Sequence, residues 1–311
     1  MAEWVERVDA DHANLLAALD GARDDAGRAA DALRMAAALV RFWTDRGHLA
    51  LGRRVLGECL ARVAPGAHDD ARASGLTAAG MLATYQSDHD EAQRYCDEAL
   101  ALHRALGDAT GCARTLAILG VLAHDRADYA TARAWYRDAL AIHRETGDRG
   151  GVARVLNNLG AMAWREGAWS EAHALASEAL EHATAVGDVG VRVVALANLG
   201  LIEVHRGRFR EAAASVGLGL EAVLEHRVLR HAPAMLETAA ALLARHAHSA
   251  RAARLYAAAD RQRERVGLSS GGAWHAAHAP LREFIERDLG PERLAVERAA
   301  GRAFELPAAR R

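Results

Sequence analysis

The sequence predicts an all-α fold, an α-α superhelix or solenoid built from about six helical hairpins with capping helices at both ends. Two observations predict it. The composition favours strong helix formers, since the 311 residues include only five prolines and 5% aromatic residues. An internal repeat with a constant spacing of 40 residues also runs through the middle of the chain. A repeat of this kind is typical of arrays in which each unit packs against its neighbours.

The repeat is defined by four sets of residues that keep the same phase over successive copies. The sets are Leu76, Leu116, Leu156 and Leu196; Gly80, Gly120, Gly160 and Gly200; Ala92, Ala132, Ala172 and Ala212; and Leu100, Leu140, Leu180 and Leu220. Glycine inside a helix costs about 1 kcal/mol relative to alanine, so the glycines need a compensating reason. We expect them to mark the close approach of the two helices of a hairpin, with the alanines on the facing helix.

Each unit is predicted to be a helix, a short turn and a second helix. In the third copy, apolar residues at helical spacing predict helices over 152–164 and 170–184, with Ser170 as the N-cap of the second. The units are predicted to end at Gly107-Asp108, Gly147-Asp148 and Gly187-Asp188, where glycine can adopt the left-handed conformation that ends a helix.

The phase of the repeat also predicts the domain organisation. Leu60 and Gly47 remain in register on the N-terminal side, and Ala252 does so on the C-terminal side. We therefore expect an N-terminal capping helix in 1–27, a repeat array over 28–266 and C-terminal capping helices in 267–311. The last region divides into helices predicted over 274–288 and 291–304.

Composition excludes several classes of function. The 39 basic residues are all arginine, and with 41 acidic residues they give a net charge of −2. Without lysine, the chain cannot form a phosphate-binding loop of the Gly-Lys-Ser/Thr type or a Schiff base. With no excess of positive charge, direct nucleic-acid binding by this segment and attraction to a membrane surface are not expected.

Cysteine usage and hydropathy bear on location. Cys59, Cys96 and Cys112 show neither metal-site nor disulfide spacing and are predicted to be reduced core residues. No signal sequence or membrane-spanning run is recognisable, which leads us to expect a cytoplasmic protein. No catalytic motif is present, so we expect no enzymatic activity and no cofactor. The histidine pairs His246/His248 and His275/His278 lack further ligands, so no metal site is predicted.

The segment Leu156-Asn157-Asn158-Leu159-Gly160, followed by Gly167, Ala172 and Leu180, resembles the tetratricopeptide repeat in its 40-residue form. The flanking segments Trp4–Val8, Arg41–Trp43 and Ala252–Tyr256 are similar to the repeat regions of bacterial multidomain transcriptional regulators with a STAND-type ATPase. This resemblance implies a sensing arm that binds a protein or peptide in signal transduction, with the DNA-binding and ATPase modules absent from these residues. A stand-alone scaffold for complex assembly is the alternative, and an enzyme acting on a small molecule is a remote third.

In the fold that this resemblance implies, the first helix of each hairpin lines a concave groove. The candidate ligand-binding residues there are Arg114, His124, Arg154, Asn157, Asn158, Trp164, Arg165 and Asn198. In the resembled family, asparagines at the sites of Asn158 and Asn198 bond a peptide backbone, and a carboxamide offers both donor and acceptor. Arg114 and Arg154 would bind an anion, either on a peptide or on an acidic small-molecule effector. The alternatives are helix cross-linking by the asparagines, solvated arginines and a packing role for Trp164.

Overall fold

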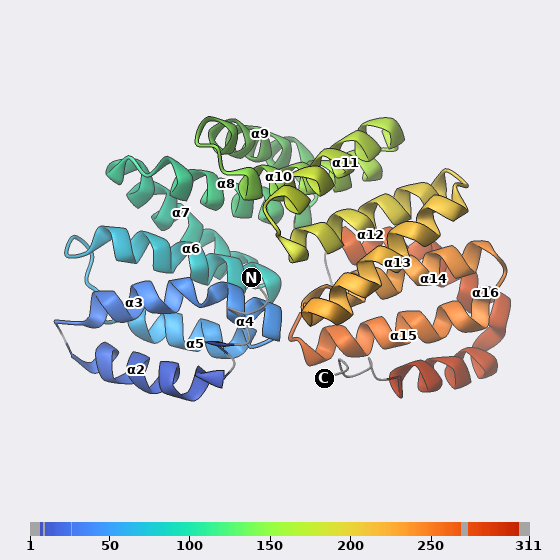
Figure 1. The fold of residues 1–311 in the computed structure, drawn as a ribbon, viewed down its shortest axis with the longest axis horizontal. Helices are drawn as coiled ribbons and strands as arrows, with labels where there is room; N and C mark the ends of the chain where they lie inside the picture. The colour runs from blue at the N-terminus through green and yellow to red at the C-terminus, as the bar shows by residue number, and fades with distance from the viewer. Residues whose placement is uncertain (1–6, 9, 26, 269–272, 305–311) are drawn as a thin grey trace. The chain divides into compact units, whose positions relative to one another are not determined.

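The computed structural model describes residues 7–8, 10–25, 27–268 and 273–304, and every regular element within these ranges is helical. The chain divides into two compact units, Met1–Gly151 and Val152–Arg311. Figure 1 shows helices that follow one another as antiparallel pairs within each unit. The predicted all-α fold of successive helical hairpins is therefore confirmed.

The first unit begins with a single helix, continues with a pair whose first helix is interrupted at Leu39, and ends with regular hairpins. Its helices are α2 (His12–Asp24), α3 (Ala29–Ala38), α4 (Val40–Arg46), α5 (Leu49–Leu60), α6 (Asp69–Tyr85), α7 (His89–Leu106), α8 (Ala109–Asp125) and α9 (Tyr129–Glu145). Helix α10 (Arg149–Arg165) contains the boundary between the two units.

The second unit continues the hairpins and ends in a long broken helix. Its further helices are α11 (Trp169–Ala185), α12 (Val189–His205), α13 (Phe209–His226), the 3-10 helix η1 (Leu229–His231), α14 (Ala232–Arg245), α15 (Ser249–Arg265) and α16 (Ala273–Arg302). Gly290 breaks α16 with φ 69° and ψ 167°, so two helical segments lie on either side of it as the sequence predicts. The side chain of Trp274 and the Trp4–Glu6 part of the N-terminal motif lie outside the described residues.

The Gly-Asp pairs end one helix and begin the next. Gly107, Gly147 and Gly187 have φ of 68°, 70° and 66°, as expected for a left-handed cap. The aspartate that follows each glycine then accepts a backbone N–H from the first turn of the next helix. The pairs are Asp108 with Gly111 at 2.8 Å, Asp148 with Gly151 at 2.9 Å, and Asp188 with Val191 at 3.2 Å. These caps fix where α8, α10 and α12 start.

The N-cap predicted at Ser170 is wrong. Helix α11 already begins at Trp169, and Ala168 occupies the N-cap position, where its methyl group cannot accept a hydrogen bond. Gly167, with φ 77°, reverses the chain directly after α10, which leaves a shorter turn than the sequence pattern suggested. Ser170 therefore lies inside the first turn of the helix.

The mid-helix glycines mark close helix contacts, as predicted. A Cβ atom added at Gly120 would lie 2.5 Å from the Tyr136 ring, and one at Gly80 would lie 2.8 Å from Cys96 Sγ. At Gly160 the nearest atoms are 3.4 Å away and include the backbone of Ala172. The repeated alanines on the facing helices are fully buried. Small residues on both helices thus allow the backbones of each hairpin to approach closely.

No helix in the described part of the chain combines the length and the apolar character that crossing a bilayer requires.

Candidate functional site

The candidates in the first unit lie on α8. Arg114 is exposed, and its positive charge contributes to lowering the pKa of the neighbouring His103. His124 is buried at the end of the helix, where its ring centroid lies 5.6 Å from that of Tyr129. Arg114 is thus available to a ligand, whereas His124 is part of the packing at the turn.

In the second unit, Asn157 on α10 and Asn198 on α12 are bonded to each other. The Nδ2 of Asn198 donates to Oδ1 of Asn157 at 2.8 Å, and both side chains are buried. One repeat later, Thr238 on α14 donates to the backbone carbonyl oxygen of Ala197 on α12 at 3.3 Å. These bonds link successive first helices, which is the alternative considered for Asn198 from the sequence.

Asn158 and Arg154 remain accessible on α10. Asn158 is half-buried, and its carboxamide forms no hydrogen bond with any residue that the structure describes. Arg154 is exposed on the same helix, with Nη1 3.7 Å from Oδ2 of Asp188. Residues four positions apart on a helix lie on one face, so this face offers a carboxamide and a guanidinium side by side. The two groups can bond a peptide backbone and a carboxylate respectively.

Trp164 and Arg165 lie at the C-terminal end of α10. The ring of Trp164 is half-buried against the core, 6.0 Å from the Trp169 ring and 5.3 Å from the His205 ring. Arg165 is exposed and ends the helix. Trp164 therefore joins the packing between α10, α11 and α12, while Arg165 extends toward solvent at the turn.

A buried polar network in the first unit was not recognised from the sequence. His103 on α7 has Nδ1 2.8 Å from Oδ2 of Asp108, and its Nε2 lies 3.0 Å from the Thr77 hydroxyl on α6. Thr77 in turn contacts the Thr115 hydroxyl on α8 at 3.0 Å. Burial lowers the pKa of His103, and the carboxylate of Asp108 opposes this shift only in part. A neutral imidazole therefore joins three helices.

The same arrangement recurs 40 residues later. His143 Nδ1 lies 3.1 Å from Asp148 Oδ2, and a Cβ atom at Gly151 would lie 2.2 Å from that nitrogen. In the next copy the histidine is replaced by Ala183 and the glycine by Val191. The spacing His-x4-Asp-x2-Gly in two successive copies was the signal that could have revealed this network.

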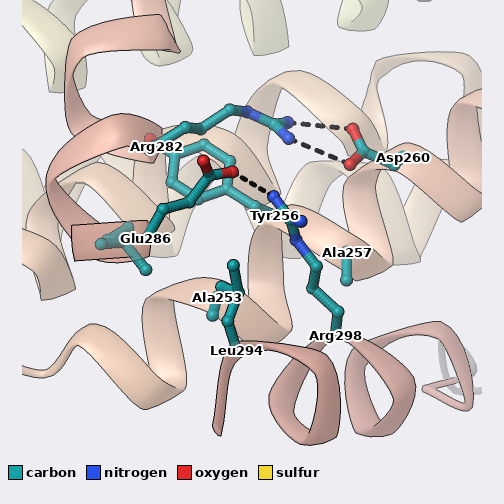
Figure 2. A pocket seen from close by; sticks show the side chains of 9 residues that line it. Ala253, Tyr256, Ala257, Asp260, Arg282, Glu286, Leu294 and Arg298 are labelled. Atoms are coloured by element: carbon teal, nitrogen blue, oxygen red, sulfur yellow. Dashed lines mark hydrogen bonds and ion pairs between the residues drawn. The ribbon is translucent and has the colours of Figure 1, made fainter. Parts of the chain in front are cut away.

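A second buried network fixes α16 against α14 and α15. Glu237 is fully buried and accepts hydrogen bonds from Arg263 at 2.9 Å and Arg282 at 3.0 Å. Figure 2 shows the Arg282 guanidinium facing both carboxylate oxygens of Asp260, at 2.9 and 3.0 Å, beside the Tyr256 ring. The hollow between them has room for about one water molecule. This network is a structural clamp rather than a ligand site.

No group of three or more potential metal ligands gathers in the described residues. His246 packs its ring 4.5 Å from that of Phe209, and His278 is buried with Nδ1 3.1 Å from the Tyr256 hydroxyl. Both histidines thus have packing roles in the structure.

The successive hairpins and the 40-residue repeat define a helical-repeat fold. Residues 71–145 match the family model described as tetratricopeptide repeat. No curated protein sequence gives a significant match to the chain.

Several solved structures share the fold at low sequence identity. BtubC (BKLC) from P. vanneervenii has a TM-score of 0.52 and 19% identity, over 70% of this chain and 90% of that chain. A Rap protein complexed with competence and sporulation factor has a TM-score of 0.57 and 13% identity, over 85% and 77% of the two chains. The Rap conjugation gene regulator of plasmid pLS20, in complex with the Phr* peptide, has a TM-score of 0.57 and 17% identity, over 84% and 76%.

Proposed function

We propose that the chain is a non-catalytic module that binds a linear segment of a protein or peptide on the first helices of its hairpins. The observation that carries this proposal is the face of α10, where the half-buried carboxamide of Asn158 is open to a ligand beside Arg154. A buried amide that gains a hydrogen bond from a ligand backbone contributes more binding free energy than an amide that stays in water. Peptide binding by a Rap protein of similar fold gives further support.

Within this proposal, the residues have different roles. Asn158 bonds the ligand backbone, and Arg154 and Arg165 attract its carboxylates. In the first unit, Arg114 on α8 offers the same charge to an acidic group. Asn157 and Asn198 hold α10 and α12 together beneath this face through their mutual hydrogen bond. Trp164 supports this face by packing against His205, and His124 packs against Tyr129 in the first unit. An acidic small-molecule effector would use the arginines in the same way.

We further propose that binding serves regulation, as the sensing region of a bacterial transcriptional regulator acting in the cytoplasm. The resemblance of the flanking segments to such regulators supports this role. In that setting, ligand binding would change the interactions of the repeat region with the ATPase module of the same protein.

Selection from a library of random linear peptides on the purified chain would provide a ligand to test the site. The selected peptide is then titrated against wild type, Asn158→Ala and Arg154→Ala by calorimetry. Asn158→Ala should weaken binding by about 1–2 kcal/mol, since a ligand amide loses its partner. Arg154→Ala should weaken it by a similar amount, about 1–2 kcal/mol, and abolish part of the salt dependence.

Arg137→Ala serves as the control, because Arg137 is exposed on the second helix of a hairpin. It should bind the peptide like wild type. Wild-type affinity in both Asn158→Ala and Arg154→Ala would show that the ligand does not bind this face.

A further inference from the structure

The turns between the two helices of each hairpin in the second unit form a continuous feature. We call it the turn edge and define it as turns 166–168, 206–208 and 246–248 together with the neighbouring helix residues Trp169, His205, Phe209, Arg210 and Arg245. Ring contacts connect it from turn to turn. The rings of Trp169 and His205 stack at 5.2 Å, and those of Phe209 and His246 meet at 4.5 Å. Trp169 remains partly exposed, so an aromatic surface is open at this edge.

The turn edge is rich in arginine. Arg206, Arg210 and Arg245 are exposed, and none of them forms an ion pair with a residue that the structure describes. Arg208 only approaches the buried Glu203, with Nε 3.7 Å from Oε2, and His173 takes the other carboxylate oxygen of Glu203 at 2.9 Å. The carboxylate of Glu203 is therefore shared between His173 and Arg208. The charges of Arg206, Arg210 and Arg245 face solvent.

Two of the corresponding turns in the first unit, 86–88 and 126–128, have the opposite character. Asp88 and Asp128 occupy the N-cap positions of α7 and α9 and accept backbone N–H groups there. The acidic groups of these turns are also paired internally, as Asp88 is with Arg53 at 2.7 Å and Asp90 with Arg126 at 3.3 Å. Asp88 and Asp90 are thus neutralised by arginines of the same unit.

In the second unit, the same N-cap positions hold Ala168, Arg208 and His248, and none of them caps its helix through a side chain. A positive or neutral residue at the positive end of a helix dipole is unfavourable compared with aspartate. The turn edge therefore combines three arginines without ion pairs, Arg206, Arg210 and Arg245, with helix ends that lack a side-chain cap and the partly exposed ring of Trp169. Negative groups from another molecule would stabilise all of these features together.

We propose that the turn edge is a docking surface for an acidic linear segment of a partner protein, separate from the face of α10 that carries Asn158. Neighbouring helices pack about 8–10 Å apart, and an extended chain rises about 3.3 Å per residue. Acidic residues spaced about three positions apart on the partner would therefore meet the arginines of successive turns. An apolar side chain of the partner, placed between its acidic residues, contacts the exposed face of Trp169.

A protein segment fits this surface better than a nucleic acid. Glu166, Glu171 and Glu211 lie among the arginines. These carboxylates would repel an unbroken row of phosphates, whereas a peptide can place its acidic residues opposite the arginines alone. The net charge of −2 provides no wider attraction for a polyanion.

The test uses the full chain and two fluorescein-labelled peptides. One has glutamate at every third position and the other has glutamine at the same positions. Fluorescence anisotropy is measured for wild type, for the edge variant Arg206→Gln/Arg210→Gln/Arg245→Gln, and for the control variant Arg227→Gln/Arg265→Gln/Arg293→Gln. The control removes the same charge from exposed arginines of this unit that lie away from the turn edge. Thermal melting establishes that both variants are folded.

The glutamate peptide should bind wild type and the control variant equally, and the edge variant about tenfold or more weakly. The glutamine peptide should bind poorly to all three, and added salt should weaken glutamate-peptide binding to wild type. Equal binding by the edge and control variants, equal binding of the two peptides, or no binding to wild type would overturn the proposal. So would tighter binding of a single-stranded RNA oligonucleotide, which would identify a nucleic-acid surface. Asn158→Ala should bind the glutamate peptide normally, which separates this surface from the proposed peptide site.

Discussion

His103 and Asp108 form a contact of 2.8 Å between Nδ1 and Oδ2 at the junction of α7 and α8. The other oxygen of the same carboxylate accepts the backbone N–H of Gly111, also at 2.8 Å. One aspartate thus caps α8 and holds an imidazole from α7. A Cβ atom at Gly111 would lie 2.1 Å from His103 Nδ1, so the imidazole occupies the space that any larger residue would need.

Gly111→Ala should therefore destabilise the fold by about 1–3 kcal/mol, because the new methyl group displaces the imidazole. Urea unfolding followed by circular dichroism measures this change. Gly217→Ala is the matched control, since a Cβ atom there would meet nothing within 4 Å. It should be neutral or raise the free energy of unfolding by up to about 1 kcal/mol.

His103→Ala should restore much of the stability lost in Gly111→Ala when the two changes are combined. The pair Ala183 and Val191, at the equivalent positions of a later copy, shows that the junction accepts a larger residue when the histidine is absent. A double-mutant cycle measures the coupling. Additive effects of the two substitutions would contradict the contact described here.

Stability should fall as the pH drops below about 6.5. Burial lowers the pKa of His103, and burial together with the charge of Arg245 lowers that of His205, both from an ordinary value of 6.5. Between 6.5 and the folded pKa values, the unfolded state binds more protons than the folded state. The contribution of these two histidines to the free energy of unfolding is complete above pH 6.5. It is lost as the pH falls from 6.5 through their folded pKa values. Denaturation over a pH series measures it.

His103→Gln should make this pH dependence shallower, because glutamine does not titrate. A variant whose stability follows the same pH curve as wild type would mean that His103 does not contribute.

Gly160→Leu should destabilise the second unit by about 1–3 kcal/mol or more, since a branched side chain would force α10 and α11 apart. A Cβ atom alone would lie 3.4 Å from the nearest atoms. Gly160→Ala is therefore expected to change stability much less than the leucine substitution. Thermal melting of both variants distinguishes the two effects. Equal melting temperatures for wild type and Gly160→Leu would contradict the observed helix contact.

Glu237→Gln should destabilise the packing of α16 by about 3–5 kcal/mol, because Arg263 and Arg282 would lose their shared buried carboxylate. Relative to wild type, amide hydrogen exchange in Glu237→Gln should accelerate more in α15 and α16 than in α12. Glu225→Gln is a suitable control, as Glu225 is largely exposed and forms an ion pair only with His226 among the described residues. Wild-type exchange rates in Glu237→Gln would show that the network does not fix α16.

The sequence by itself determined the helical hairpin fold. The 40-residue phase of small and apolar residues depends on local helix geometry and on contacts between neighbouring helices, so it can be recognised along the chain. For the same reason, the sequence located the left-handed glycines and the break at Gly290. Ser170 was misplaced as an N-cap because serine is favourable in the position but does not decide where a turn ends.

Only the tertiary structure decided which polar residues are already bonded to one another. Asn157 and Asn158 are adjacent and chemically identical, yet the first is buried and bonded to Asn198, whereas the second is half-buried and forms no hydrogen bond with any described residue. Likewise, Arg53 and Arg126 pair with acidic residues at the turns of the first unit, whereas Arg206, Arg210 and Arg245 form no ion pair with any residue that the structure describes. Hydrogen bonds and ion pairs form between groups far apart in the chain, and the direction of a side chain on its helix selects its partner.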